Sequence, residues 1–306
     1  ALTVGIEQRK VNWILDADIR AFFDKLDRNW LIRFLEHRIG DKRIIRLITK
    51  WLNAGVMEGL DWADTGRGVP QGAVVSPVLA NAYLHYVFDL WAQSWRNRKG
   101  KGDMIVVRYA DDFVVGFQHQ WEAENFLNDL RERLARFGLD LHPDKTRLIA
   151  FGRFAKARRK ERGLNKPETF DFLGMTHFCA KTQRGKFRVG RKPSRKRVRR
   201  TLRRIKEELR RRRHMGKHEV ARWLARVING WLNYYAVPGT SKALSGFIIA
   251  VKRLLLRTLR RRSQKDRTKW TTLARLIEFH WPEPTTRHPW PSQRLTVNIQ
   301  GRSRMR

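Results

Sequence analysis

Hydrophobic and polar positions alternate differently in the two parts of the chain. In the first 178 residues, short apolar runs are interspersed with stretches in which apolar side chains recur at helical spacing. These patterns predict strands at 13–15, 104–109, 113–117, 142–151 and 170–178, and helices at 30–39, 42–52, 77–96 and 122–137. Further along, helices are predicted at about 194–213, 218–235, 241–262 and 269–280. The sequence therefore indicates an α+β domain with an antiparallel sheet and flanking helices, followed by a helical bundle.

The segments between these elements are mostly basic or rich in Gly and Pro. Residues 64–78 hold three Gly and two Pro and are predicted to begin as a loop. A basic loop is predicted at 153–166 and a basic connector at 181–197, and a strand-like run closes the chain at 294–299. We therefore divide the chain into an α+β domain at 1–178, a basic linker at 179–192, a helical domain at 193–280 and a Pro-rich, basic tail at 281–306.

Charge is distributed very unevenly over these parts. The chain has 66 Lys and Arg against 29 Asp and Glu, a net charge of +37. Residues 1–150 hold 22 basic and 20 acidic side chains, a net of +2, whereas residues 151–306 hold 44 and 9, a net of +35. A polyphosphate is the usual partner of such an excess, so the second half predicts nucleic-acid binding.

Other bulk features restrict the setting. A single cysteine, Cys179, excludes an internal disulfide and a cysteine-pair zinc site. No apolar run is long enough to span a membrane. We expect a reducing, intracellular compartment and no membrane partner. Because the chain begins without Met or a signal-peptide pattern, we also expect it to be cut from a longer protein.

Carboxylates stand at the ends of two predicted strands. Asp18 follows the apolar run at 13–15, and Asp111 with Asp112 follows the run at 104–109. Acidic side chains at such positions are costly unless they bind a cation or a charged partner. Side by side, the strands would offer three hard oxygen ligands for Mg²⁺. Taken alone, Asp-Asp between two strands is ordinary turn chemistry.

Four further motifs accompany these carboxylates. They are GVPQG at 68–72, SPVLAN at 76–81, GLDLHPDKT at 138–146 and FDFLG at 170–174. In order and spacing, the whole set resembles the polymerase motifs of group II intron-encoded reverse transcriptases. The resemblance implies a polymerase palm followed by a helical thumb, or maturase, bundle. It also implies the activity of an RNA-directed DNA polymerase.

The resemblance assigns roles to individual residues. Two Mg²⁺ ions would be held at Asp18, Ile19, Asp111 and Asp112, and Lys145 would assist the departure of pyrophosphate. The expected substrate contacts are Ile19, Arg20, Phe23, Gln71, Gly72, Tyr109 and Ala110, with Tyr109 and Ala110 at the primer end. Phe23 would act as a steric gate against a 2′-OH, which points to deoxynucleotides and speaks against an RNA polymerase.

Simpler interpretations of some of these residues remain open. A core aromatic is the alternative for Phe23, and an exposed loop lysine is an equal alternative for Lys145. For Arg20, an ion pair with a nearby acid such as Asp24 is simpler than a contact with triphosphate. The run at 170–178, which resembles a primer grip, is also consistent with a plain core strand. The sequence departs from the family at Ala73, where a second Gly is usual, and in lacking a fingers region before Asp18. We expect a separate chain or segment to supply the fingers.

The helical half combines thin apolar stripes with many arginines. Arginine suits phosphate because its planar fork binds two oxygens. We expect nucleic-acid contacts from Arg195, Lys196, Arg199, Arg200, Arg203, Arg204, Arg260, Arg261 and Arg262. Among the 12 Trp, Trp281 and Trp290 lie in Pro-rich segments and are the better candidates for stacking on bases.

The expected function is RNA-directed DNA synthesis for a group II intron, with intron RNA binding, splicing assistance and insertion into DNA. Its expected partners are template and intron RNA, a DNA primer or target, and deoxynucleoside triphosphates. Two alternatives stay open: an RNA-binding maturase without polymerase activity, or a related bacterial reverse transcriptase of the CRISPR, phage-defence or diversity-generating type. The segment GWLNYY at 230–235 favours the intron version.

Overall fold

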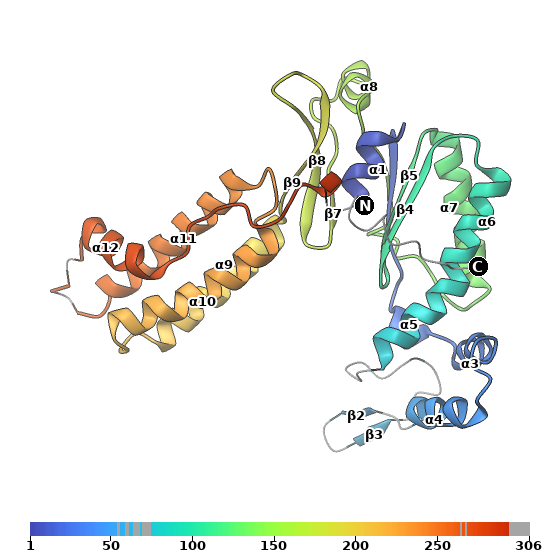
Figure 1. The fold of residues 1–306 in the computed structure, drawn as a ribbon, viewed down its shortest axis with the longest axis horizontal. Helices are drawn as coiled ribbons and strands as arrows, with labels where there is room; N and C mark the ends of the chain where they lie inside the picture. Colours follow the sequence, from blue (N-terminus) through green and yellow to red (C-terminus); the bar gives the residue numbers. More distant parts are fainter. Residues whose placement is uncertain are drawn as a thin grey trace. The chain divides into compact units, whose positions relative to one another are not determined.

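The chain forms two compact units (Figure 1). The computed structural model describes residues 1–53, 56–58, 61–63, 68, 75–263, 265–266 and 268–293. Unit 1 comprises Ala1–Glu168 with Lys181–Arg188, and unit 2 comprises Thr169–Ala180 with Val189–Arg306. The domain boundaries inferred from the sequence stay a prediction.

An antiparallel sheet of four strands forms the centre of unit 1. Its order is β4 (Met104–Tyr109), β5 (Asp112–Phe117), β1 (Trp13–Asp18) and β6 (Arg147–Ala150). Strands β4 and β5 form the hairpin that the sequence predicted, and β1 pairs with both β5 and β6. The strand expected at 142–151 is shorter, because residues 143–145 form a turn.

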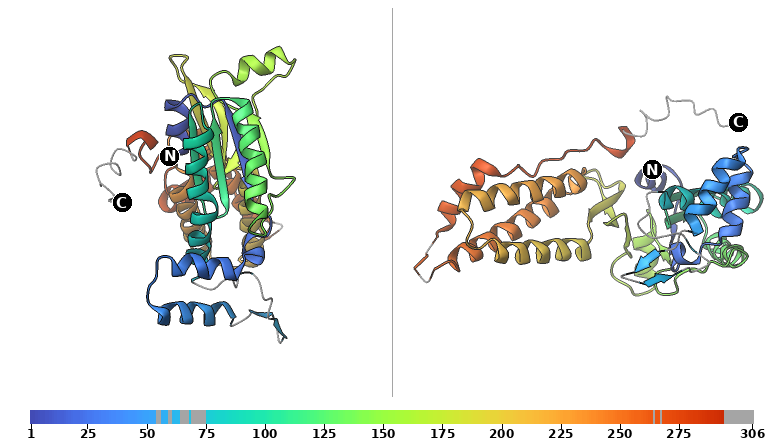
Figure 2. Two further views of the ribbon diagram at one scale, coloured as in Figure 1. Left: turned by 90° about the vertical axis from the view of Figure 1, so that its right-hand side faces the viewer. Right: turned by 90° about the horizontal axis from the view of Figure 1, so that it is seen from below.

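Two helices, α6 (Leu90–Lys99) and α7 (Gln120–Ala135), cover one face of this sheet (Figure 2). Aromatic side chains fill the layer between them, since the Trp95 ring lies 5.0 Å from Phe126 and Phe126 lies 5.3 Å from Phe117. Helix α5 (Ser76–Leu84) continues into α6 through η1 (His85–Asp89), a single π-helical turn. Such turns carry one extra residue and occur frequently at functional sites.

The remaining elements of unit 1 are short. They are α1 (Leu2–Gln8), α2 (Phe22–Lys25), α3 (Arg28–Glu36), α4 (Lys42–Asn53), β2 (Val56–Glu58), β3 (Asp61–Ala63) and α8 (Ala155–Glu161). Asp27 caps α3 by accepting hydrogen bonds from the backbone N–H groups of Asn29 and Trp30. The expectation of a loop at 153–166 is wrong over α8. Its Ala, Lys, Arg and Glu residues favour a helix although they offer no apolar stripe.

Unit 2 combines a small sheet with a helical bundle. The sheet contains β7 (Phe170–Phe172), β8 (Met175–Lys181) and β9 (Phe187–Pro193). The expectation of a basic connector at 181–197 is therefore wrong over β9. Its alternation of basic and small or apolar residues suits a strand that is exposed on one face. The helices are α9 (Arg195–Arg211), α10 (Lys217–Tyr235), α11 (Ser241–Arg260) and α12 (Trp270–His280), close to the predicted bounds.

The bundle has a continuous apolar core. Leu224, Ile228 and Leu255 are fully buried, and the Trp231 ring stacks on Phe247 at 3.8 Å. Trp281 is only 9% exposed and donates its indole N–H to the Ala221 carbonyl, so the proposal that it stacks on bases is wrong. The strand expected at 294–299 lies outside the described residues. No described helix is both long and apolar enough to cross a membrane.

Gly152 allows the end of β6 to pass close to the segment before β1. Its φ is +136°, and an added Cβ would lie 2.4 Å from the Val11 carbonyl oxygen. We expect Gly152→Ala to lower the free energy of unfolding by on the order of 2 kcal/mol. Gly40→Ala, where no atom lies within 4 Å, should change it by less than about 0.5 kcal/mol. Denaturant unfolding measures both, and an equal loss of stability in the two variants would contradict this account.

Candidate active site

The carboxylates of the sequence motifs meet at one end of the central sheet. Asp18 closes β1 and Asp112 opens β5, and the two residues are direct partners across the antiparallel ladder. Asp111 precedes Asp112 in the turn between β4 and β5. The apolar residues of β1 and β5 are buried, and they carry the carboxylates to the rim of the core.

The segment before β6 fixes the backbone around Asp18. The carbonyl of Asp18 accepts a hydrogen bond from the His142 N–H at 2.8 Å, and Ile19 bridges Leu141. The N–H of Arg20 donates to the Asp140 carbonyl at 2.8 Å. These bonds hold the motif at 138–146 against the end of β1, which explains why the two motifs occur together.

Lys145 forms an ion pair with the first of these carboxylates. Its Nζ lies 2.5 Å from Oδ2 of Asp18, although its side chain is 60% exposed. The hydrogen bond to Asp18 raises the pKa of Lys145, and the charges of Asp18, Asp111 and Asp112 raise it further. Lys145 is thus both exposed and close to all three carboxylates. A lysine there offsets part of their mutual repulsion.

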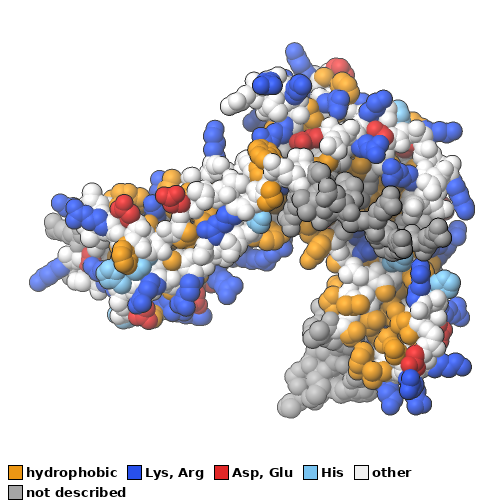
Figure 3. Space-filling view, viewed as in Figure 1, with side chains coloured by type: hydrophobic (Ala, Val, Ile, Leu, Met, Phe, Trp, Pro, Cys, Tyr) orange, Lys and Arg blue, Asp and Glu red, His pale blue; other side chains and the backbone are white. Residues whose placement is uncertain are grey.

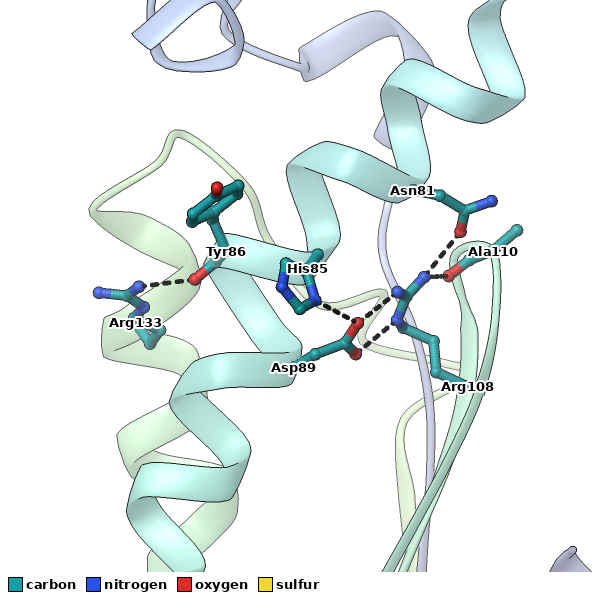
Figure 4. Close-up of polar contacts among 7 residues, drawn as sticks. All are labelled: Asn81, His85, Tyr86, Asp89, Arg108, Ala110 and Arg133. Atoms are coloured by element: carbon teal, nitrogen blue, oxygen red, sulfur yellow. Dashed lines mark hydrogen bonds and ion pairs between the residues drawn. The ribbon is translucent and has the colours of Figure 1, made fainter. Parts of the chain in front are cut away.

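The turn that carries Asp111 is conformationally strained. Ala110 has a φ of 54°, which an L residue other than glycine rarely adopts. Arg108 spans this turn and donates a hydrogen bond of 2.9 Å to the Ala110 carbonyl (Figure 4). Strained residues of this kind persist where the surrounding structure holds them in place.

Arg108 is itself held from the helical layer. Its guanidinium donates to both carboxylate oxygens of Asp89, at 2.7 and 2.5 Å, and to the side-chain oxygen of Asn81 at 2.9 Å. The Arg108 side chain is only 13% exposed. His85 Nδ1 lies 3.7 Å from Asp89, which closes the π-helical turn. We call Arg108, Asp89 and Asn81 the turn brace.

Sequence reasoning missed the turn brace. Arg108 and Asn81 stand inside motifs that were recognised, but only the carboxylates and their neighbours received roles. Strand alternation gave a signal, since it places Arg108 on the opposite face from Tyr109. No sequence signal pointed to Asp89, because the spacing of apolar residues does not predict where a helix contains a π-helical turn.

The predicted substrate residues surround the carboxylates only in part. Tyr109 is 66% exposed beside the turn, and Arg20 is exposed without an ion pair to any described residue. Phe23 is half-buried, and its ring lies edge-on to Phe22 at 5.4 Å. The N–H of Gly68 donates to the Leu26 carbonyl, which places the start of the motif at 68–72 beside the backbone of Phe23. Gln71 and Gly72 lie outside the described residues.

The predicted nucleic-acid contacts all belong to unit 2. The α9 residues among them are exposed, and they are Arg195, Lys196, Arg199, Arg200, Arg203 and Arg204. At the end of α11, Arg260 and Arg261 are exposed, but Arg262 is half-buried. Arg260 also donates its Nε to the Thr268 carbonyl. The α9 cations are therefore the more accessible set.

The donor set agrees with a hard cation. No three His, Cys, Asp or Glu side chains within the described ranges already converge as a metal cage. Mg²⁺, however, is usually bound by one or two carboxylates together with water and substrate phosphates. Asp18 and Asp112, paired across the ladder, supply such carboxylates.

The environment of Lys145 gives a direct test of this geometry. We expect Asp18→Asn to lower the pKa of Lys145 toward that of a free lysine, since it removes the charged acceptor. Asp144→Asn, which removes the exposed neighbouring acid, should leave that pKa nearly unchanged. NMR titration of ¹³C-labelled lysine side chains, assigned with Lys145→Arg, measures it. Equal shifts in the two variants would contradict a specific Lys145–Asp18 contact.

Comparisons with known proteins cover both units. Residues 3–177 match the family described as reverse transcriptase (RNA-dependent DNA polymerase), and residues 196–276 match the group II intron maturase-specific domain. The group II intron-encoded protein LtrA of Lactococcus lactis is 39% identical over 83 residues, which are 27% of this chain and 14% of LtrA. An uncharacterized 91 kDa protein in the cob intron of Schizosaccharomyces pombe is 45% identical over 73 residues, 24% of this chain and 9% of that protein.

Among solved structures, one of telomerase from Candida albicans in complex with a fragment of telomeric RNA is similar. The alignment covers 94% of this chain and 46% of the telomerase chain. The identity is 14% and the TM-score 0.47. The chain spans well under two thirds of the length of these relatives. The reverse transcriptase match alone covers more than half of the chain, so the protein belongs to the reverse transcriptase (RNA-dependent DNA polymerase) family, and its second unit carries a match to the group II intron maturase-specific domain.

Proposed function

We propose that the chain catalyses RNA-directed DNA synthesis for a group II intron, as the palm and thumb of the polymerase. The observation that carries this proposal is the cluster of Asp18, Asp111 and Asp112 around Lys145 at the end of the central sheet. Membership of the reverse transcriptase family supports the same reaction. Residues 1–178 would form the palm and residues 193–280 the thumb.

Two Mg²⁺ ions are the proposed cofactors, held by Asp18, Asp111 and Asp112 with Ile19 beside them. When bound, they would stabilise charge on the attacking and leaving oxygens of the phosphoryl transfer. Lys145 stabilises the carboxylates while no other cation is near. Its long, exposed side chain allows it to turn from Asp18 toward a departing pyrophosphate.

The substrates follow from the residues near the carboxylates. Tyr109 and Ala110 would contact the primer end, and Gln71 with Gly72 the incoming nucleotide. Phe23 would exclude a 2′-OH and so select deoxynucleoside triphosphates. Its edge-on contact with the buried Phe22 ring limits its movement, as a steric gate requires.

Unit 2 would hold RNA through the exposed arginines of α9. Val198, Leu202, Ile205 and Leu209 face the bundle core, so the remaining positions of α9 are free to present cations. A phosphate backbone is the partner that such a surface fits, and intron RNA is the partner that the maturase-specific match suggests. Splicing assistance and insertion into DNA would follow from this binding.

One alternative is an RNA-binding maturase that keeps unit 1 only as a scaffold. The presence of Asp18, Asp111 and Asp112 argues against it, and so does the strained turn at Ala110, because strained backbone of this kind clusters at functional sites. A related reverse transcriptase of another bacterial system is the second alternative. The maturase-specific match over α9 to α12 favours the intron type.

Primer extension tests the proposal directly. On a poly(rA)–oligo(dT) template with Mg²⁺, we expect incorporation of dTTP but not UTP. Asp111→Ala should reduce the rate on the order of a thousandfold, since it removes charge that holds the metal ions. Asp144→Ala removes an exposed acid nearby and should leave the rate within about twofold. No incorporation, together with tight binding of intron RNA, would support the maturase alternative instead.

The turn brace predicts a loss of rate without a loss of binding. Arg108→Gln should lower kcat about tenfold or more and raise the Mg²⁺ concentration needed for half-maximal rate, because the turn carrying Asp111 is no longer held. Affinity for the template–primer duplex should stay close to that of wild type. Arg108→Lys should restore part of the rate.

A matched control and a double variant sharpen this test. Arg131→Gln removes an exposed cation from α7 and should change neither kcat nor the Mg²⁺ requirement. Asp89→Asn combined with Arg108→Gln should cost little more than either change alone, since both act on one turn. A Mg²⁺ requirement equal to wild type in Arg108→Gln would show that the brace does not position the carboxylates.

A further inference from the structure

A second concentration of positive charge lies in unit 1, outside the carboxylate site. It consists of exposed cations from α8 with the loop after it, and from the tip of the β8–β9 hairpin. We call it the distal basic surface, and its residues are Lys156, Lys160, Arg162, Lys166, Lys181, Arg184 and Lys186. Both segments lie at the same end of unit 1, where Figure 3 shows Lys and Arg side chains gathered.

This surface is at the opposite end of the sheet from the carboxylates. Strand β1 pairs Trp13 with Ala150 at one end, and Asp18 with Asp112 at the other. Helix α8 begins five residues after Ala150, and the Arg158 guanidinium lies over the Trp13 ring at 5.5 Å. A strand of this length separates its ends by about 17 Å. A nucleotide at the carboxylates therefore does not reach the distal basic surface.

The charges of this surface are not neutralised within the described part of the chain. None of the seven cations forms an ion pair with a described acidic residue, whereas Glu168 pairs with Arg159 at 3.3 Å. Helix α8 thus directs Arg158 and Arg159 inward, to Trp13 and Glu168, and leaves Lys156 and Lys160 exposed. Glu161 is the only acidic residue of α8. Concentrated charge of one sign is unfavourable unless a partner of opposite charge binds.

Apolar side chains accompany these cations. Phe154 is 53% exposed immediately before α8, and Leu164 is exposed in the loop that follows it. An exposed aromatic ring beside lysines suits an unpaired base joined to phosphates. An acidic peptide would form ion pairs with the cations but would leave the Phe154 ring without a stacking partner. The combination therefore favours RNA.

We infer that the distal basic surface binds the backbone of a structured RNA at a place separate from the carboxylates. The proposed function enters this inference only through the choice of RNA as the partner. The RNA would then be held by unit 1 at two points, and shorter nucleic acids would reach only the first. Binding of long RNA and copying of a short template should consequently be separable by substitution.

The dependence of binding on salt is the most direct readout. The probe is a long hairpin-rich RNA transcript, with a short template–primer duplex for comparison, each titrated at several KCl concentrations. Replacing Lys156, Lys160, Arg162 and Lys166 together by Gln removes four cations. The slope of log Kd against log salt should fall by about 3, because each phosphate contact contributes roughly 0.7 to 0.9. Affinity for the long RNA should fall on the order of tenfold or more at physiological salt.

A control of equal charge distinguishes this surface from net charge alone. Arg96, Arg98, Arg131 and Arg136 are exposed on or next to α6 and α7, and their joint replacement by Gln also removes four cations. It should change the slope by less than 1. Circular dichroism and the Tm confirm that each variant is folded. Replacing Lys181, Arg184 and Lys186 by Gln should give a smaller loss of the same kind.

Three outcomes overturn the inference. They are an unchanged slope in the α8 variant, an equal loss in the control variant, and loss of binding to a poly-glutamate peptide while RNA binding is kept. Primer extension on the short duplex distinguishes a failure of this RNA-binding inference from a failure of the proposed polymerase function. Normal extension with lost RNA binding supports both proposals. If wild type fails to extend the primer while the α8 variant loses RNA binding, only the polymerase proposal fails.

Discussion

Repulsion among three carboxylates at the end of a buried strand is the constraint around which unit 1 is organised. Asp18, Asp111 and Asp112 lie at one rim of the sheet, where each negative charge raises the cost of the next. Lys145 reduces this repulsion, because its flexible side chain brings an ammonium group into hydrogen-bond contact with Asp18. Arg108 does not neutralise the three carboxylates. It is held by Asp89 and fixes the backbone of the turn that carries Asp111.

The elements that carry the site were largely predictable because their patterns are local. The two apolar runs around Ala110, Asp111 and Asp112 are separated by a short turn and so favour a hairpin, and the apolar stripe of α9 is a regular helical repeat. What joins these elements was not predictable in the same way. The pairing of β1 with β5, which brings Asp18 to Asp112, was expected only because isolated acids at strand ends need a shared cation.

The failures have physical causes that can be named. Helix α8 was missed because dense charge was taken as a sign of a loop, although Arg and Lys are good helix formers. Trp281 was assigned to solvent because prolines surround it, yet its ring fills the bundle core and its N–H reaches a helix carbonyl. Arg108 gave only a weak signal, because a half-buried arginine depends on partners that lie 19 and 27 positions away.

The π-helical turn at His85–Asp89 makes the site sensitive to chain length rather than to chemistry alone. Helices α5 and α6 run on from each other, and η1 accommodates one additional residue between them. Removing a single residue there would turn α6 by roughly 100° relative to α5. Asp89 would then lose its contact with the Arg108 guanidinium, whereas Asn81 on α5 would retain its hydrogen bond to Arg108. A one-residue deletion far from any acid of the catalytic cluster would thus uncouple the helical layer from the strands, with every carboxylate still present.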